Sequence, residues 1–587
     1  MRRSLFFVLA ALLFVGAGAL PVRALVAPDF GEEPRAYGRY QHYAVAAHHP
    51  LASAAGAEIL QAGGNAADAA VATALALGVV SPEASGLGGG GFALYYRASD
   101  HSLTFLDFRE RAPAATTPET FARREGDDDA AVAARSQTGG LAVAVPGEPA
   151  GLEAILTRFG SGRVPRADIV APAEALAREG FAASRSMADY SGAFRRELAA
   201  DPVLATFLPA EGPIVQGTTI RNPALARTIH ELGAHGARAF YRGAIAREIV
   251  RVVHDHGGTI TAADLAAYEV RERTPLEATR FGHRIVTAPP PSAGGFTLLA
   301  SLAMLERWMP APQEGAALRH ALAESWIGPF DDRQAYAGDP DFAEIPVAAL
   351  LDEARIAARA ARFDPRRHHD AADWAMPLPG PAPAATEGGE DHGTSHFCVA
   401  DPEGNVMAMT TTVNLPFGAR LTAGGMVLND EMDDFARGVG ETNAFGLVGG
   451  AANLPGPGHR PVSTMTPTLV LDARGAPILC AGGAGGSRIV TAVEQVLIFA
   501  LFVDGDLGAA VARPRVHHQG MPATLSTEIA LPADLALALA ARGHDLSAPV
   551  PSSANVQAIR LVRDDMGEIV RIEAASDPRK EGEPRGL

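Results

Sequence analysis

Residues 393–414 carry the pattern that most restricts how this chain can fold. Two segments of alternating side chains, His396 to Ala400 and Val406 to Val413, flank the turn sequence Asp401-Pro-Glu-Gly-Asn405. Period-two alternation on both sides of a short stretch rich in Asp, Pro, Gly and Asn is typical of a β-hairpin. The chain is therefore expected to form two adjacent antiparallel strands here.

The register of this hairpin follows from its turn. A symmetric turn pairs Ala400 with Val406 and, counting outward, places Thr394 opposite Thr412. Because side chains return to the same face every second residue, Asn414 shares the face of the two threonines. A β-bulge would shift this pairing. The sequence thus predicts that one hairpin brings two threonines and an asparagine together.

Thr394 has two interpretations. A threonine hydroxyl is a weak nucleophile until a base takes its proton, and an N-terminal threonine uses its own α-amine as that base. Thr394 lies deep inside the chain, so this use requires cleavage after Gly393, whose small size leaves its carbonyl open to attack. The other interpretation is a threonine-rich strand without chemistry, because threonine favours strands. The hairpin alone favours this second interpretation.

Three segments around the hairpin carry a family resemblance. They are Thr394-Ser-His-Phe-Cys-Val399, Thr410-Thr-Thr-Val-Asn414 and Asn429-Asp-Glu-Met-Asp-Asp-Phe435. These motifs closely resemble the γ-glutamyltranspeptidase (glutathione hydrolase) family of self-cleaving N-terminal nucleophile hydrolases. The resemblance runs from about residue 42 to about residue 580. It implies an α+β fold, the four-layer αββα sandwich of that superfamily, which composition alone does not show.

The resemblance also implies how the chain is divided. Cleavage before Thr394 gives a large subunit, residues 25–393, and a small catalytic subunit, residues 394–587, which form a heterodimer. Within the large subunit, residues 364–393 are expected to be a flexible linker, because they are charged, then proline-rich, then rich in Gly and Glu. Such a linker allows the freed end to move away from Thr394.

Residues 1–24 are interpreted as an export signal and leader. Arg2 and Arg3 precede an apolar run from Leu5 to Val15, and Ala17-Gly-Ala19 is a plausible cleavage site. The alternative is a membrane anchor, but the apolar run is too short to span a bilayer. Export places the protein in the periplasm or outside the cell. The paired arginines suggest a twin-arginine route without excluding the general route.

Charge and composition limit the partners. The 587 residues carry a formal net charge of −17, which argues against binding to nucleic acid or to an anionic membrane surface. No other stretch is long and apolar enough to span a membrane. Cys398 and Cys480, the only cysteines, each lie in an apolar strand-like run. We expect buried free thiols, although a disulfide is possible after export.

Other patterns predict structure rather than a bound cofactor. The glycines of Gly86-Leu-Gly-Gly-Gly-Gly91 follow a helical stretch and precede a strand, the reverse of a dinucleotide-binding motif, so we expect them to let backbone pack closely. His368 and His369 lack acidic or cysteine partners at ligand spacing, so no metal is expected. The region between residues 149 and 363 is mainly helical, and the helices predicted at Pro172–Glu179 and Pro223–Leu232 begin on prolines.

The resemblance assigns the chemistry to four residues. Thr394 attacks the γ-amide carbonyl of the substrate, and Thr412 positions the attacking hydroxyl. The backbone N–H groups of Gly485 and Gly486 form the oxyanion hole, in a glycine-rich turn between a strand and a helix. Standing alone, that glycine sequence would be read only as a tight turn.

Recognition of the γ-glutamyl group needs charges of both signs. The motif around Arg109, through its resemblance to the family, implies that this arginine binds the α-carboxylate. The hydroxyls of Ser463 and Thr464 are implied to assist it. An arginine of this kind is more often a surface residue. The groups implied to bind the α-ammonium are Asn414, Glu431 and Asp434.

The expected substrate is a small molecule such as glutathione, with transfer of the γ-glutamyl group to water, amino acids or peptides. No cofactor is expected. One alternative is an acylase for glutaryl-type β-lactam side chains, which would not need the acidic pair. Another is a non-catalytic periplasmic binding protein. A long loop, residues 437–461, is expected to act as a lid, with Phe445 where many bacterial relatives have tyrosine.

Overall fold

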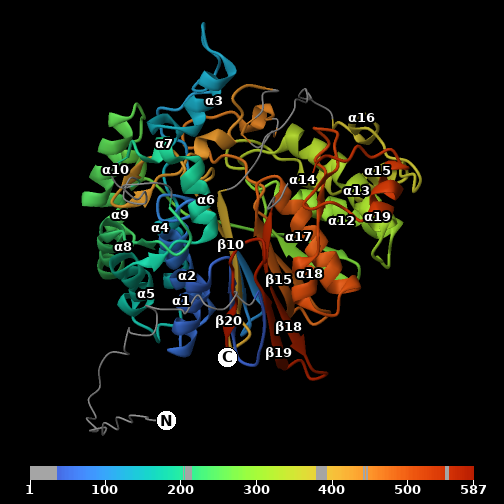
Figure 1. Ribbon diagram of the computed structural model, residues 1–587, viewed down its shortest axis with the longest axis horizontal. Coiled ribbons are helices and arrows are strands. Elements are labelled where there is room, and N and C mark those ends of the chain that lie inside the picture. Colours follow the sequence, from blue (N-terminus) through green and yellow to red (C-terminus); the bar gives the residue numbers. More distant parts are fainter. Residues whose placement is uncertain are drawn as a thin grey trace, which may run out of the picture.

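Two antiparallel seven-stranded β-sheets pack against each other at the centre of the computed structural model (Figure 1). Helices cover the outer face of each sheet, which gives the predicted four-layer αββα order. The structure describes residues 36–201, 204, 214–378, 393–439, 443–444, 447, 449–548 and 554–587. The expected export signal and leader lie outside these residues.

The first sheet contains the predicted hairpin at its centre. Its strands, in spatial order, are β20 (Arg585–Gly586), β2 (Ala44–Ala47), β10 (Thr394–Ala400), β11 (Val406–Thr412), β3 (Gly90–Arg97), β4 (Ser102–Phe108) and β7 (Arg271–Arg273). β10 and β11 pair Ala400 with Val406 and Thr394 with Thr412. The register predicted from the turn is therefore confirmed.

The second sheet lies against the first through β10, β11 and the strand β15. Its strands, in spatial order, are β1 (Tyr37–Tyr40), β19 (Ile569–Ala575), β18 (Asn555–Arg563), β15 (Pro477–Ala484), β14 (Thr468–Leu471), β9 (His283–Thr287) and β8 (Leu276–Arg280). Both sheets contain strands from before and after residue 393. The two halves of the chain therefore share both sheets.

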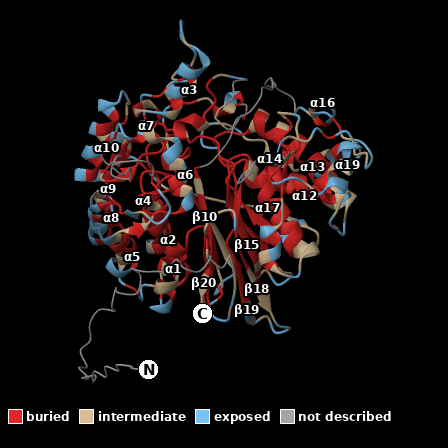
Figure 2. Cartoon of the chain, viewed as in Figure 1, coloured by how far each residue is buried: buried red, intermediate tan, exposed pale blue. Residues whose placement is uncertain are grey.

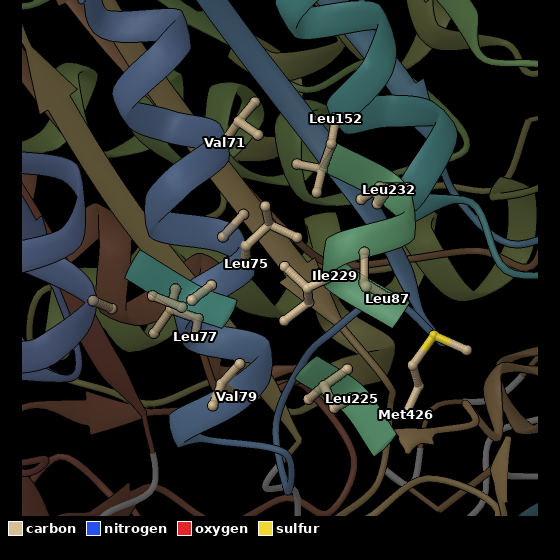
Figure 3. Packing of buried hydrophobic residues seen from close by; sticks show 14 of the residues in the cluster. Val71, Leu75, Leu77, Val79, Leu87, Leu152, Leu225, Ile229, Leu232 and Met426 are labelled. Atoms are coloured by element: carbon tan, nitrogen blue, oxygen red, sulfur yellow. The ribbon is translucent and has the colours of Figure 1, made fainter. Parts of the chain in front are cut away.

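Helices from the first half of the chain cover the first sheet. They are α1 (Pro50–Gln61), α2 (Ala66–Val80), α4 (Glu148–Phe159), α5 (Arg166–Glu179), α8 (Pro223–His235), α9 (Arg238–Arg242), α10 (Ala244–Asp255) and α11 (Ala262–Ala266). Figure 2 shows that their outer surfaces are exposed, whereas the sheets are buried. Leu75 of α2 and Ile229 of α8 point toward each other in the core between these helices (Figure 3).

The second sheet is covered by helices from both halves. They are α12 (Gly294–Trp308), α13 (Ala316–Tyr336), α17 (Arg488–Ile498), α18 (Leu507–Ala512) and α19 (Ala533–Ala540). The remaining short helices and strands are α3 (Asp129–Gln137), α6 (Arg185–Ala193), α7 (Arg195–Leu198), α14 (Val347–Leu350), α15 (Glu353–Ala360), α16 (Ala371–Trp374), β5 (Phe181–Ala182), β6 (Thr219–Ile220), β12 (Thr422–Ala423), β13 (Met426–Val427), β16 (Val516–His517) and β17 (Ser526–Thr527). No helix in the described residues has the length and apolar composition to cross a membrane.

The glycine run before β3 lets three segments approach closely. A Cβ atom on Gly88 would lie 1.9 Å from the carbonyl oxygen of Val427, and one on Gly89 would lie 1.9 Å from that of Thr412. Real Cβ atoms do not approach backbone oxygen so closely. Only glycine fits there, which confirms the predicted role in backbone packing beside the hairpin.

Two local expectations are wrong. α5 begins at Arg166, so Pro172 lies inside the helix rather than in its first turn. Burial of apolar residues on both sides of the proline offsets the intrahelical hydrogen bond that it cannot make. Cys398 and Cys480 are joined in a disulfide that links β10 to β15. Their strands face each other across the two sheets with Cα atoms 6.3 Å apart, so the expectation of free thiols is not met.

The segment 364–378 is also more ordered than the expected flexible linker. It contains α16, and the Trp374 side chain is fully buried in a small apolar cluster. The backbone N–H of His368 donates to the carbonyl of Arg542, 2.6 Å away. Hydrophobic burial and these contacts hold the segment against α13 and α19. The rest of the expected linker, residues 379–392, lies outside the described residues.

Glu148 provides a pH test of this core. Its side chain is fully buried at the start of α4 and accepts a hydrogen bond from the Thr411 hydroxyl. Burial raises the pKa of Glu148 to about 8. Between pH 5 and pH 8 the folded state therefore keeps a proton that the unfolded state releases, so the free energy of unfolding falls as pH rises.

We predict that Glu148→Gln, which resembles the protonated acid, becomes more stable relative to the wild type as pH rises from 5 to 8. Thermal unfolding of both proteins across this range measures the difference in Tm. The exposed substitution Glu119→Gln serves as the control and should show a constant difference. A Tm difference for Glu148→Gln that does not change with pH would contradict the prediction.

Candidate active site

The polar ends of β10 and β11 lie at one end of the first sheet. The Thr394 and Thr412 hydroxyl oxygens are 3.2 Å apart, and the backbone N–H of Asn414 donates to the Thr412 hydroxyl at 2.8 Å. Asn414 has a φ of 76°, in the left-handed region, and its side-chain amide donates to the carbonyl of Asp430. The hairpin thus brings together the two threonines and the asparagine, as its register predicted.

The Thr412 hydroxyl also contacts the bond before Thr394. The Thr412 hydroxyl donates to the Gly393 carbonyl oxygen at 2.8 Å. Because a hydroxyl has one proton, the Thr412 oxygen can only accept in its contact with Thr394. Thr412 therefore polarises the Gly393 carbonyl and orients the Thr394 hydroxyl at the same time.

Gly393 fits this position because it has no side chain. A Cβ atom there would lie 1.7 Å from the carbonyl oxygen of Asn414. Any larger residue would push the junction away from the Thr412 hydroxyl. The close backbone contact and the polarised carbonyl therefore depend on each other.

A buried arginine with carboxylate partners lies beside the hairpin. Arg109 follows β4 and is 1% exposed. Its guanidinium group donates to the carboxylates of Glu431 and Asp434. It also donates to the carbonyls of Pro461 at 3.2 Å and Val462 at 3.1 Å. This arginine is the centre of a buried ion-pair cluster and not a surface residue.

The chain around Arg109 is held by a second set of polar contacts. The Asp107 carboxylate accepts from the backbone N–H of Arg109 at 2.9 Å and from the Arg273 side chain at 2.7 Å. The Tyr268 hydroxyl donates to the carbonyl of Arg109 at 2.8 Å. Fixed partners on both sides of the residue limit where its guanidinium group can point.

Glu431 and Asp434 lie on a single 3-10 turn, Glu431–Asp434. An acidic run of this kind is usually solvated, but here the Glu431 carboxylate is buried and that of Asp434 is only 11% exposed, both beside Arg109. Burial raises the pKa of Asp434 to about 7, against the opposing effect of Arg109. The pKa of Glu110 is raised well above its usual range by burial and by the nearby Glu431 charge. The intervening Asp433 turns away and pairs with Arg437.

The other predicted residues complete one cavity. The Thr464 hydroxyl donates to the Gly486 carbonyl at 2.7 Å, and the Ser463 hydroxyl accepts from the backbone of Met465. Gly485 and Gly486 have φ values of 134° and 47°, which turn the chain from β15 into α17. The cavity is lined by Arg109, Arg333, Thr394, Thr412, Asn414, Glu431, Asp434, Leu447, Val462, Ser463, Thr464, Met465, Gly486 and Ile489. Of the ten residues predicted from the sequence, Gly485 alone is not among them.

Arg333 was not predicted from the sequence. It lies on α13, in the opposite half of the sandwich from Arg109, and its side chain has no hydrogen bond to any described residue. Burial lowers its pKa to about 10, with an opposing effect from Asp434. Arg333 directly follows Asp331 and Asp332 in α13, a short charged stretch that matches no motif of a binding site. Phe445 lies outside the described residues.

Comparison with known proteins places this cavity in a family. The model of the gamma-glutamyltranspeptidase family matches residues 52–587. The chain belongs to the γ-glutamyltranspeptidase family. The glutathione hydrolase proenzyme of Escherichia coli K12 is 36% identical to this chain over 541 residues. The match covers 91% of this chain and 90% of that protein. Glutathione hydrolase 2 of Arabidopsis thaliana is 34% identical, and the match covers 93% of this chain and 94% of that protein.

Solved structures show the same fold for this γ-glutamyltranspeptidase family member. A cephalosporin acylase from Bacillus halodurans has a TM-score of 0.80 at 24% identity and covers 98% of this chain and 99% of its own. A Helicobacter pylori γ-glutamyltranspeptidase chain has a TM-score of 0.52 at 33% identity and covers 55% of this chain and 92% of its own. The first likeness concerns the fold only. The second protein is itself a γ-glutamyltranspeptidase, the family to which this chain belongs.

We predict that Thr412→Val slows cleavage of the chain before Thr394. Valine keeps the shape of threonine but cannot donate to the Gly393 carbonyl, and loss of one such donor costs roughly 10²- to 10³-fold in rate. The intact and cleaved fractions of purified protein, followed over time on denaturing gels, measure this effect. Thr104→Val, in β4 of the same sheet, is the matched control. Cleavage of Thr412→Val at the wild-type rate would remove Thr412 from the reaction.

Proposed function

We propose that this protein is a self-cleaving γ-glutamyltransferase that also hydrolyses glutathione. One observation carries the proposal. A threonine with an oriented hydroxyl shares a cavity with a buried arginine and two carboxylates. The first group suits acyl transfer, and the second suits a substrate that ends in a carboxylate and an ammonium group.

Cleavage produces the nucleophile. The Thr394 hydroxyl attacks the Gly393 carbonyl, and the C–N bond breaks as the amide nitrogen takes a proton. Water then hydrolyses the resulting ester, leaving a carboxylate on Gly393 and a free α-amine on Thr394. The products are a large subunit ending at residue 393 and a small subunit of residues 394–587.

Turnover uses the same groups on an external amide. The free α-amine of Thr394 takes the proton of its own hydroxyl, whose oxygen attacks the γ-carbonyl of the donor. The backbone N–H groups of Gly485 and Gly486 stabilise the oxyanion. The leaving amine, Cys-Gly when the donor is glutathione, receives the proton. The γ-glutamyl ester then passes to water or to the amine of an amino acid or peptide.

The ion-pair cluster around Arg109 recognises the γ-glutamyl group of the donor. The α-carboxylate of the γ-glutamyl group pairs with Arg109, and the hydroxyls of Ser463 and Thr464 contribute hydrogen bonds. Asn414 and the carboxylates of Glu431 and Asp434 receive the α-ammonium. A zwitterionic donor carries one positive and one negative charge. When it lies between Arg109 and the carboxylates, the pairing of Arg109 with a carboxylate is replaced by two pairings, one at each end of the donor. The buried net charge does not change. Arg333 lines the same cavity, and its positive charge interacts with Asp434.

Two alternatives are weaker. A glutaryl acylase would have no ammonium group to place against the acidic pair, and the likeness to cephalosporin acylase concerns the fold only. A binding protein without activity would not need the polarised Gly393 carbonyl. The N-terminal sequence supports export to the periplasm or beyond. After cleavage the two subunits remain together as a heterodimer.

We predict that the wild type separates between Gly393 and Thr394 and that Thr394→Ala does not. Alanine has no hydroxyl to attack the preceding carbonyl. Intact mass spectrometry distinguishes the single chain from two products and locates the break. An uncleaved wild type, or a cleaved Thr394→Ala protein, would disprove the cleavage mechanism.

We predict that Asp434→Asn matures normally but loses at least roughly tenfold in kcat/KM for a γ-glutamyl anilide, because it removes a buried partner of the ammonium group. The same variant should not be impaired toward glutaryl anilide, which lacks that group. Wild-type KM for the γ-glutamyl donor should rise as pH falls below about 7, since protonation of Asp434 removes its charge. An equal loss on both anilides would remove Asp434 from ammonium recognition.

A further inference from the structure

A group of mostly buried imidazoles lies outside the active-site cavity. It is found where α13, α19 and the segment 364–374 meet, at the edge of the second helix layer (Figure 1). We name it the histidine cluster; its members are His320, Glu324, His368, His369, His518 and His544. The proposed chemistry uses none of these residues.

Two imidazole nitrogens in the cluster face each other. The Nε2 of His320 is 2.9 Å from the carbonyl oxygen of Asp364, which can only accept, so Nε2 carries the proton and Nδ1 carries a lone pair. That Nδ1 is 2.7 Å from the Nε2 of His544. His544 is 4% exposed, and its other nitrogen has no partner among the described residues.

Glu324 supplies an oxygen to the same place. It lies one turn after His320 on α13, so both side chains emerge from the same face of the helix. One ligand atom from each of Glu324, His320 and His544 lies within 4.8 Å of the other two. The Glu324 carboxylate also accepts from His368 at 2.6 Å and from His369 at 2.9 Å. Hydrogen bonds of this kind orient a ligating carboxylate.

We propose that His320, His544 and Glu324 bind a divalent transition-metal ion, with Zn²⁺ as the best fit. Two imidazoles and one carboxylate form a donor set that Zn²⁺ accepts in proteins. Tetrahedral Zn²⁺ with Zn–N bonds of about 2.0–2.1 Å separates two nitrogens by about 3.3 Å. The two nitrogens, 2.7 Å apart, therefore need to separate by about 0.6 Å, and the two rings need to turn so that both lone pairs point at the ion.

The other histidines differ in their availability. His518 accepts a hydrogen bond at Nδ1 from the backbone of Gly520, so its Nε2 carries the proton and is not a ligand. His368 donates from Nδ1 to Glu324, which leaves a lone pair on its Nε2. Its ring centroid lies 4.5 Å from that of His544. His368 is therefore the nearest additional donor.

The position of the site gives the ion a structural role. His320 and Glu324 belong to the large subunit and His544 to the small subunit, a division that rests on the proposed cleavage. The disulfide lies within the small subunit alone. An ion at the histidine cluster would fasten α13 of the large subunit to the small-subunit segment that follows α19. The sequence around His368 and His369 did not predict this site, because their partner Glu324 lies more than 40 residues away in the chain.

The test uses full-length protein stripped with a chelator and titrated with Zn²⁺ in a calorimeter, and with Co²⁺ in a visible spectrometer. We expect one ion per chain and the intense bands of tetrahedral Co²⁺. His544→Gln and Glu324→Gln should weaken binding at least roughly 100-fold. The controls His518→Gln, in the cluster, and His235→Gln, exposed on α8, should bind as the wild type does.

The outcomes separate a metal site from a hydrogen-bonded network of imidazoles. Wild-type protein without bound Zn²⁺ and without the Co²⁺ bands would overturn the proposal, as would binding that His544→Gln leaves unchanged. If a variant fails to fold, the wild-type Co²⁺ spectrum decides by itself. Uncleaved Thr394→Ala should bind the ion equally well, so failure of the proposed cleavage would not affect the result.

Discussion

The active-site end of this molecule depends on the register between β10 and β11. That register places the Thr412 hydroxyl 2.8 Å from the Gly393 carbonyl and beside the Thr394 hydroxyl. A slip of one residue would turn the threonines to opposite faces of the sheet and remove both contacts. The glycines before β3 and at position 393 preserve the register, because any side chain there would collide with backbone oxygen.

The buried ions are the second constraint. Arg109 is taken out of water, and such a burial is favourable only when the charge is fully paired. Its carboxylate partners and two backbone carbonyls provide that pairing within the protein itself. The proposed recognition of a zwitterionic donor would use the same groups. Burial of Arg109 and the proposed recognition of the donor would therefore depend on one set of charges.

Shared sheets explain how a cleaved chain can stay together. β2, β3 and β4 precede residue 393, yet they pair in one sheet with β10 and β11, which follow it. The second sheet mixes the two halves in the same way. Cleavage would leave these ladders and the core between them intact. The histidine cluster lies outside both sheets, where residues 364–374 meet α13 and α19.

The sequence by itself determined the hairpin and its register, because a period-two pattern and a short turn act over neighbouring residues. Nine of the fourteen residues that line the cavity were also predicted, most of them only through the resemblance of their motifs to the family. It also determined the family, through motifs that remain contiguous. Only the tertiary structure decided the disulfide, the ordered segment 364–378 and the places of Glu110 and Arg333 in or beside the cavity. His320 and His544 are 224 residues apart and meet only because α13 and α19 pack together. Contacts of that kind leave no local pattern, since they are fixed by the packing of whole elements.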